Sequence, residues 1–362
     1  MFLTRYARDF YTRFEHRISS LFLVAGFIFD AFTLKRVDNL WENVWIGSYL
    51  IIIGFFIVLT HTKEVEGDDE RGPSGAHFWY VNILQFAFGG VFSAYLVLYF
   101  RSADIVVAWP FIALLALIFI ANEFLKKHYV RLSFQISLFF LSIYWFAIFL
   151  VPVLLHKIGA VVFILSGVVS LIIIKLFVNV LFYFTKDKFI QSRNLIVSLI
   201  AGVIVLVNFL YFTNLIPPIP LSLKDGGIYH MVQKTKDGNY MVTHEEKKWS
   251  DYFKFYTDIH YLSGTPVYAW SAIFSPKNLN LTILHEWQRY ISDKDIWQTQ
   301  RVIQLPVVGG RDGGFRTYSV RSDLNPGKWR VNIKTESGQI IGRLRFNIVP
   351  VDAEPILQTM LK

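Results

Sequence analysis

The chain contains no cysteine. This absence excludes a disulfide framework, a thiolate nucleophile and a cysteine-based metal site. Charged residues are also scarce, at 17% of the 362 residues, where an average protein has roughly 25%. Apolar and aromatic residues make up 54%, and the mean hydropathy is +0.41. This balance excludes a disordered chain, a coiled coil and an ordinary cytosolic enzyme, and it indicates a membrane protein with several spans.

Long apolar runs are confined to the first 216 residues. A helix needs roughly 17–25 apolar residues to cross a bilayer. The sequence predicts seven such spans, at residues 18–36, 43–60, 78–100, 105–125, 132–155, 158–180 and 195–216. The first span is the weakest, because Asp30 interrupts it. It follows a basic stretch, but no small-x-small cleavage site comes after it, so we expect an anchor that is retained.

The loops between these spans carry Lys and Arg unevenly. Twelve lie on one side of the predicted membrane and four on the other. Cytoplasmic loops carry the excess of Lys and Arg in membrane proteins. We therefore expect a cytoplasmic N-terminus and, after seven spans, a C-terminal region outside the cytoplasm.

The pattern changes after the helical region. Pro217, Pro218 and Pro220 stop the last helix, since proline lacks the N–H that a helix needs. Residues 217–264 are interpreted as a linker and irregular segment. From residue 265 to 362 apolar residues recur at every second position, which predicts strands at 266–275, 280–290, 298–308 and 315–321, and a final hairpin that turns at 335–338. This spacing favours a small all-β sandwich of immunoglobulin-like type.

Polar residues inside the predicted spans are candidates for a transport path. Asp30 is the main one, because an intramembrane carboxylate is costly and by default marks an ion or proton path. The alternative is a carboxylate near the outer interface, paired with Lys35 or Arg36. Asn82 and Gln85 add amides, which more often join helix to helix than line a pathway.

The last predicted hairpin carries four cations, at Lys328, Arg330, Arg343 and Arg345. If Trp329 is buried, these four share the outward face of the hairpin. Like charges across a strand pair are destabilising, and an anionic partner would relieve the repulsion. The candidates are lipid headgroups, acidic glycans and cell-wall carboxylates. The alternative is an ordinary solvated face whose charges oppose aggregation at a sheet edge.

The same region resembles a known family. The residues that carry the resemblance are His285-x-Trp287 and, above all, the run Pro326-Gly327-x-Trp329-Arg330-Val331. They resemble an uncharacterised bacterial family that is classed only as a domain of unknown function and that commonly follows membrane helices. The resemblance covers about residues 265–350. It implies a bacterial envelope protein with a β-rich outer domain, and it supplies no activity.

Two functions from different classes stay open. The first is a non-enzymatic protein of the bacterial inner membrane, whose periplasmic β domain binds a glycan, a lipid or a protein. The second is a transporter or lipid-handling protein that works through its helices, with the β domain as accessory. The sequence shows no catalytic constellation and no metal motif, and His285 alternates with Ile283 and Trp287 as a core histidine would. We expect no cofactor and no nucleic acid, and we expect as partners the lipid bilayer and an anionic envelope component or a periplasmic protein.

Overall fold

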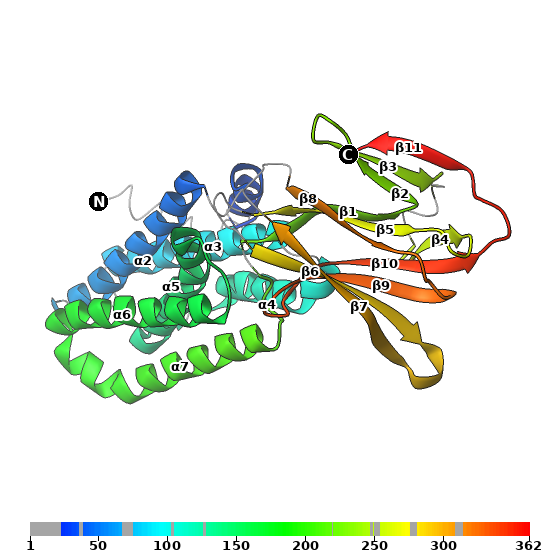
Figure 1. Ribbon diagram of the computed structural model, residues 1–362. Coiled ribbons are helices and arrows are strands. Elements are labelled where there is room, and N and C mark those ends of the chain that lie inside the picture. The colour runs from blue at the N-terminus through cyan, green and yellow to red at the C-terminus, as the bar shows by residue number, and fades with distance from the viewer. Residues whose placement is uncertain are drawn as a thin grey trace. The chain divides into compact units, whose positions relative to one another are not determined.

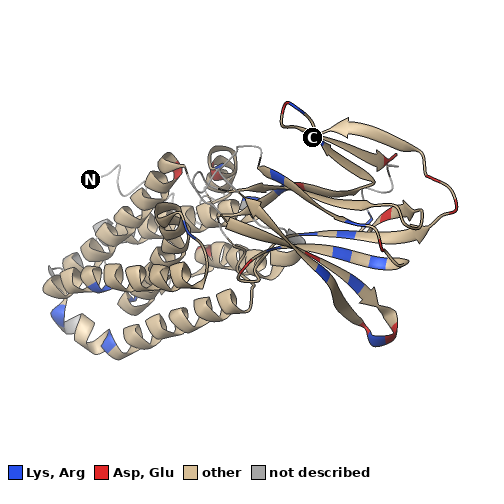
Figure 2. Ribbon diagram, viewed as in Figure 1, with Lys and Arg blue, Asp and Glu red and all other residues tan. Residues whose placement is uncertain are grey.

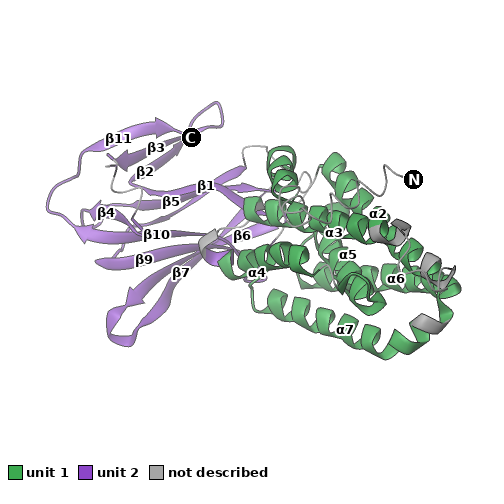
Figure 3. Ribbon diagram, turned by 180° about the vertical axis from the view of Figure 1, so that it is seen from behind, with its two compact units in different colours: residues 1–101, 109–216 green, residues 102–108, 217–362 purple. Residues whose placement is uncertain are grey.

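A computed structural model describes residues 23–35, 39–66, 75–102, 105–125, 128–218, 220–246, 249, 254–275, 281–307 and 314–362. The chain divides into two compact units, shown in different colours in Figure 3. The helical unit comprises residues 1–101 and 109–216, and the β unit comprises residues 102–108 and 217–362.

Six long helices make up most of the helical unit (Figure 1). They are α2 (Leu40–Glu66), α3 (Gly75–Ser102), α4 (Ile105–Phe124), α5 (Leu132–Leu155), α6 (Ala160–Phe184) and α7 (Lys186–Phe212). Each is long and apolar enough to cross a membrane, and a shorter apolar helix, Leu23–Thr33, precedes them. The predicted second to seventh spans coincide with α2 to α7. Of the predicted first span, the helix Leu23–Thr33 is present, whereas residues 18–22 and 36 lie outside the described residues.

Aromatic side chains form the interior of this unit. Tyr95 and Tyr99 of α3 pack against Phe149 of α5, with ring centroids 5.6 and 4.5 Å apart. Trp145 of α5 lies edge-on to Tyr95 at 6.0 Å. Helices α3 and α5 bury most of their apolar residues, while α6 and α7 leave most of theirs exposed. Exposed apolar surface of this extent is typical of helices that face lipid.

The described strands of the β unit form three sheets. The strands are β1 (Ser222–Tyr229), β2 (Met231–Lys234), β3 (Tyr240–Glu245), β4 (Thr257–Tyr261), β5 (Val267–Phe274), β6 (Leu281–Ile291), β7 (Ile296–Val307), β8 (Phe315–Arg321), β9 (Gly327–Thr335), β10 (Ile340–Pro350) and β11 (Leu357–Leu361). The five-stranded sheet has the order β4-β10-β9-β6-β7, the middle sheet β1-β5-β8, and the outer sheet β11-β3-β2. All pairs are antiparallel except β4 with β10, which is parallel.

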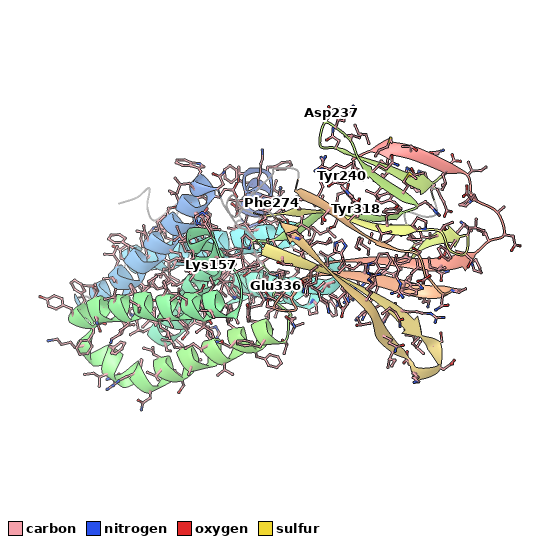
Figure 4. All side chains as sticks on the ribbon, in the orientation of Figure 1. Lys157, Asp237, Tyr240, Phe274, Tyr318 and Glu336 are labelled. Atoms are coloured by element: carbon pink, nitrogen blue, oxygen red, sulfur yellow. The ribbon has the colours of Figure 1, made fainter. Side chains whose placement is uncertain are left out.

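The middle sheet separates two cores. Val267 and Ala269 of β5 join Trp287, Trp329 and Phe346 in the core shared with the five-stranded sheet. The alternate residues of β5, Trp270 and Ala272, join a second core with the outer sheet, because successive side chains of a strand point to opposite faces. Figure 4 labels Tyr240 and Tyr318 in this second core, where their ring centroids are 6.1 Å apart.

Strands β5 to β10 coincide with the strands that alternation predicts, and Trp329 is fully buried as expected. The hairpin loop is also confirmed, since Gly338 has φ 88° and its N–H donates to the carbonyl of Thr335 at 3.0 Å. The structure differs over residues 217–264. This segment, interpreted as linker, contains β1 to β4. Strand β1 contains Gly226 and Gly227 and shows no clean alternation, so its strand conformation depends on pairing with β5.

Candidate functional site

The four predicted cations lie together on the outward side of β9 and β10, and we call Lys328, Arg330, Arg343 and Arg345 the basic face. Trp329 and Phe346, which alternate with them, point into the core on the other side of the sheet. The strand register sets Arg330 directly opposite Arg345. Figure 2 shows Lys and Arg gathered along these strands of the five-stranded sheet.

Side chains from three adjacent strands hold the arginines. Arg330 Nε donates a hydrogen bond to Gln288 Oε1 of β6 at 2.7 Å. Arg343 Nε donates to Asn332 Oδ1 of β9 at 2.6 Å. The amide of Asn332 in turn donates to Gln288 Oε1 at 3.0 Å and to Glu286 Oε2 at 2.9 Å. Because each bond crosses to a neighbouring strand, the network fixes both guanidinium groups against the sheet.

Aromatic rings flank the cations. The guanidinium of Arg330 lies over the ring of Trp297 on β7, 4.2 Å from its centroid. Arg345 lies over Phe255 at 4.3 Å, and Lys328 Nζ is 5.5 Å from the centroid of Tyr256. Cation–π contacts of this kind orient a guanidinium. The basic face is therefore bordered by aromatic side chains on both sides.

Glu286 is the acidic group within this network, and it is already engaged. It forms an ion pair with Lys334 and accepts hydrogen bonds from Asn332 and Thr299. Partial burial would raise the pKa of Glu286, but the bonds from Lys334 and Asn332 outweigh burial and lower it. Burial and the charge of Arg343 lower the pKa of Arg330 to about 10. At neutral pH the face thus keeps its excess of positive charge.

The helical unit brings the other predicted residues together. Asp30, Asn82 and Gln85 line one cavity of 340 Å³, together with Asn122 and Glu123. The alternative interpretation of Asp30, an ion pair with Lys35, does not occur. Among the described residues, no cation forms an ion pair with Asp30 or acts on its charge. Arg36 lies outside the described residues.

A chain of hydrogen bonds runs from this cavity through the helical unit. The Asn122 amide donates to the Gln85 carbonyl at 3.1 Å, and Tyr129 Oη donates to Asn122 Oδ1. Gln135 Nε2 donates to the Tyr129 carbonyl, and Gln135 Oε1 lies 3.0 Å from His61 Nε2. The Gln85 side chain joins α3 to α4, as expected of an intramembrane amide, because its Nε2 donates to the backbone carbonyl of Asn122 at 3.4 Å, and it also lines the cavity.

His285 is the buried histidine that alternation predicts. Its ring nitrogens lie 3.0 Å from Ser271 Oγ and 2.9 Å from Ser319 Oγ, and Trp287 Nε1 donates to Ser319 Oγ at 2.9 Å. Burial lowers the pKa of His285 to about 3. The ring is therefore neutral and ties the two facing sheets together. In the part of the chain that the structure describes, no group of three His, Asp or Glu is placed to hold a metal ion.

The sequence alone does not identify the residues that support the basic face. Gln288 and Glu286 alternate with the core residues Trp287 and His285, so their outward orientation was accessible from the pattern. Their position beside Arg330 and Asn332 was not, because it depends on β6 pairing with β9. The contact of Phe255 with Arg345 depends in the same way on β4 lying beside β10.

Comparison with known proteins adds a family match. Residues 280–348 match a family described as a protein of unknown function (DUF2914). This range runs from β6 through most of β10 and includes the whole basic face. No curated protein matches the chain.

Among solved structures, the chain is similar to the Pseudomonas fluorescens alkylpurine DNA glycosylase AlkC bound to DNA containing an abasic site analog. The identity is 11% and the TM-score 0.22, with 87% of this chain and 99% of that chain covered. At this TM-score the likeness carries no argument about fold or function.

Proposed function

We propose that the chain is an integral membrane protein of the bacterial inner membrane, with a cytoplasmic N-terminus, and that its periplasmic β unit binds an anionic envelope component on the basic face. Six long apolar helices, the shorter helix Leu23–Thr33 as part of a seventh span, and the bias of Lys and Arg in the loops support this membrane placement. The resemblance around Pro326-Gly327-x-Trp329-Arg330-Val331 supports an envelope protein with a domain fused to helices. The two sheets that face each other around Trp329 support the immunoglobulin-like sandwich.

One observation carries the binding proposal: Arg330 and Arg345 are held directly opposite each other although their charges repel. Arg330 uses Nε for Gln288, and its two Nη atoms donate to none of the described side chains. A guanidinium fork presents paired donors that match the paired oxygens of a carboxylate or phosphate. The ligand class is therefore an anion with such oxygens, as in a phospholipid headgroup or a cell-wall carboxylate.

Binding to soluble probes tests this proposal. The full chain in phosphatidylcholine nanodiscs is titrated with dihexanoyl phosphatidylglycerol and with soluble peptidoglycan fragments, at low and high sodium chloride. We expect binding by the wild type that weakens with salt, because exposed charges are screened beyond a Debye length of about 8 Å at physiological ionic strength. The two probes separate a headgroup phosphate from a cell-wall carboxylate.

A charge-matched pair of variants gives the control. Arg330→Gln with Arg345→Gln removes two charges from the basic face, and Lys234→Gln with Lys236→Gln removes two exposed charges elsewhere in the β unit. We expect the first variant to lose affinity by about tenfold or more and the second to bind like the wild type. Equal binding by the first variant and the wild type contradicts the proposal.

The helical cavity favours a second function, transport or lipid handling. The specific observation is that Asp30, Asn82 and Gln85, from two helices, line the same 340 Å³ space. Uptake or lipid exchange in proteoliposomes that depends on Asp30 would support this function. The same activity in Asp30→Asn and in the wild type would contradict it.

A further inference from the structure

Asp30 is a buried carboxylate that has no cationic partner among the described residues. Its side chain is 2% exposed, although the residue belongs to the apolar helix Leu23–Thr33. Among the described residues, its neighbour Ser93 makes no hydrogen bond through Oγ, and no Lys, Arg or His lies against Asp30. Burying a charge is costly unless it is paired. We therefore expect a positive group that is not among the described residues to compensate the charge of the carboxylate.

The space beside Asp30 is suited to an organic group. The cavity measures 340 Å³, which falls in the range of about 300–1,000 Å³ seen for small-molecule sites and far exceeds the room that a bare metal ion needs. Asn82, Gln85 and Asn122 line it with amides, and Phe27 and Phe119 line it with aromatic rings. Amide oxygens accept N–H hydrogen bonds, and ring faces attract cations.

We infer that this cavity binds an ammonium group, with Asp30 as its counter-ion. The carboxylate supplies the charge, the amides accept hydrogen bonds from the ammonium N–H groups, and the phenylalanine rings cover its carbon substituents. This inference deepens the second candidate function, because it names the class of molecule that the helical unit would handle. It is independent of the basic face.

The ammonium has two sources with the same chemistry, a free amine and the headgroup of an aminophospholipid. Phe29 and Phe86 line the cavity and are also 53% and 57% exposed. The cavity therefore reaches the surface of the helical unit, where a lipid headgroup would meet it. The experiment below separates the two sources.

The test measures binding to the full chain in dodecyl maltoside, a detergent without nitrogen. The probes are ethanolamine, dihexanoyl phosphatidylethanolamine and, as the lipid without an amine, dihexanoyl phosphatidylglycerol. Calorimetry and the shift of the thermal midpoint are read for the wild type, Asp30→Asn and Asp30→Glu. The matched control is Glu42→Gln, which removes another buried carboxylate of the helical unit that does not line the cavity.

We expect at least one amine probe to bind the wild type, and Asp30→Asn to lower its association constant by about tenfold or more, since a charged hydrogen bond is lost. Asp30→Glu should retain part of the binding, and Glu42→Gln all of it. Without amine, Asp30→Asn should melt no lower than the wild type, because it removes an unpaired buried charge. A thermal midpoint that is not lowered shows that lost binding does not come from a folding defect.

Binding of phosphatidylethanolamine and not of ethanolamine would assign the site to a headgroup, and the reverse would assign it to a free amine. Binding of neither amine, or equal amine binding by Asp30→Asn and the wild type, overturns the inference. A lower thermal midpoint of Asp30→Asn without amine also overturns it, because the carboxylate would then be compensated within the chain. Because binding is measured without transport, inactivity in proteoliposomes would contradict the second function and leave the site standing.

Discussion

Arg330 and Arg345 lie directly opposite each other on β9 and β10. Two cations in this position destabilise a strand pair. Each guanidinium group nevertheless lies over an aromatic ring. Arg330 is 4.2 Å from the ring centroid of Trp297, and Arg345 is 4.3 Å from that of Phe255. The two rings lie on opposite sides of the β9–β10 pair, so the neighbouring parts of the sheet order both guanidinium groups, as the proposed anion site requires.

The β unit should fold without the helices. Residues 217–362 contain two cores of their own, one on each face of the middle sheet. We expect this segment, expressed alone, to be a soluble monomer with a β-type circular dichroism spectrum. Insoluble protein, or a spectrum without strand signal, would show that the helical unit is needed for folding.

Trp329 should be a large contributor to the stability of this segment. The side chain is fully buried, packs 6.5 Å from Phe346 by ring centroids, and donates from Nε1 to the Asn325 carbonyl at 2.8 Å. We expect Trp329→Ala to lower the free energy of unfolding by about 3–5 kcal/mol, measured by urea denaturation. An unchanged denaturation midpoint would contradict the burial of this ring.

Much of this core could be predicted from sequence, and the reason is physical. Apolar and polar residues alternate along β9 and along β10 from Arg343 to Ile348, so burial of Trp329 on one side places Arg330 on the other. Strand β1 carries Gly226 and Gly227 without alternation, and its conformation comes from pairing with β5. No local pattern encodes that pairing, so the sequence predicts a linker where β1 to β4 lie.

The candidate sites divide in the same way. Alternation predicts that Lys328, Arg330, Arg343 and Arg345 share a face. Gln288 and Trp297 support Arg330 because β6 and β7 follow β9 in the sheet. This order of strands cannot be read from the sequence. Likewise Asp30, Asn82 and Gln85 could be singled out as polar residues in apolar spans. Their convergence on one cavity depends on how the helices are rotated against one another.

His285 should make the isolated β unit sensitive to mild acid. Burial lowers the pKa of His285 to about 3, whereas an unfolded histidine titrates near 6.5. Between these values the unfolded state binds one more proton, so stability falls as pH decreases through this window. The measurement is the slope of the unfolding free energy against pH. We expect this slope to be smaller in His285→Gln than in the wild type. The control is His244→Gln, and an equal slope in His285→Gln and the wild type would contradict the prediction.

Glu245 should add a second acid dependence at lower pH. Its carboxylate interacts with His230 Nε2 at 2.9 Å and accepts the backbone N–H of His260 at 2.7 Å. Partial burial would raise the pKa of Glu245, but the hydrogen bonds from His230 and His260 outweigh it and lower the pKa. A carboxylate with a lowered pKa contributes stability above its unfolded pKa of about 4.3, and this contribution is lost as pH falls through the folded value.

Glu245→Gln tests this dependence. We expect the variant to be less stable than the wild type at neutral pH, and the difference to shrink as pH falls below the unfolded pKa of Glu245. Urea denaturation of the isolated β unit over this range measures both. A difference that stays constant with pH would show that the charge of Glu245 does not contribute.

Arg345→Glu decides whether Arg330 and Arg345 together bind an anion. This change sets a carboxylate opposite Arg330, where it would occupy the guanidinium and relieve the repulsion. The measurement is the association constant of the full chain for dihexanoyl phosphatidylglycerol and for peptidoglycan fragments at low salt, with the unfolding free energy of the isolated β unit beside it. We expect binding to be lost while stability is kept or raised by about 0.2–1 kcal/mol. Wild-type binding by Arg345→Glu would contradict a shared anion site of these two arginines.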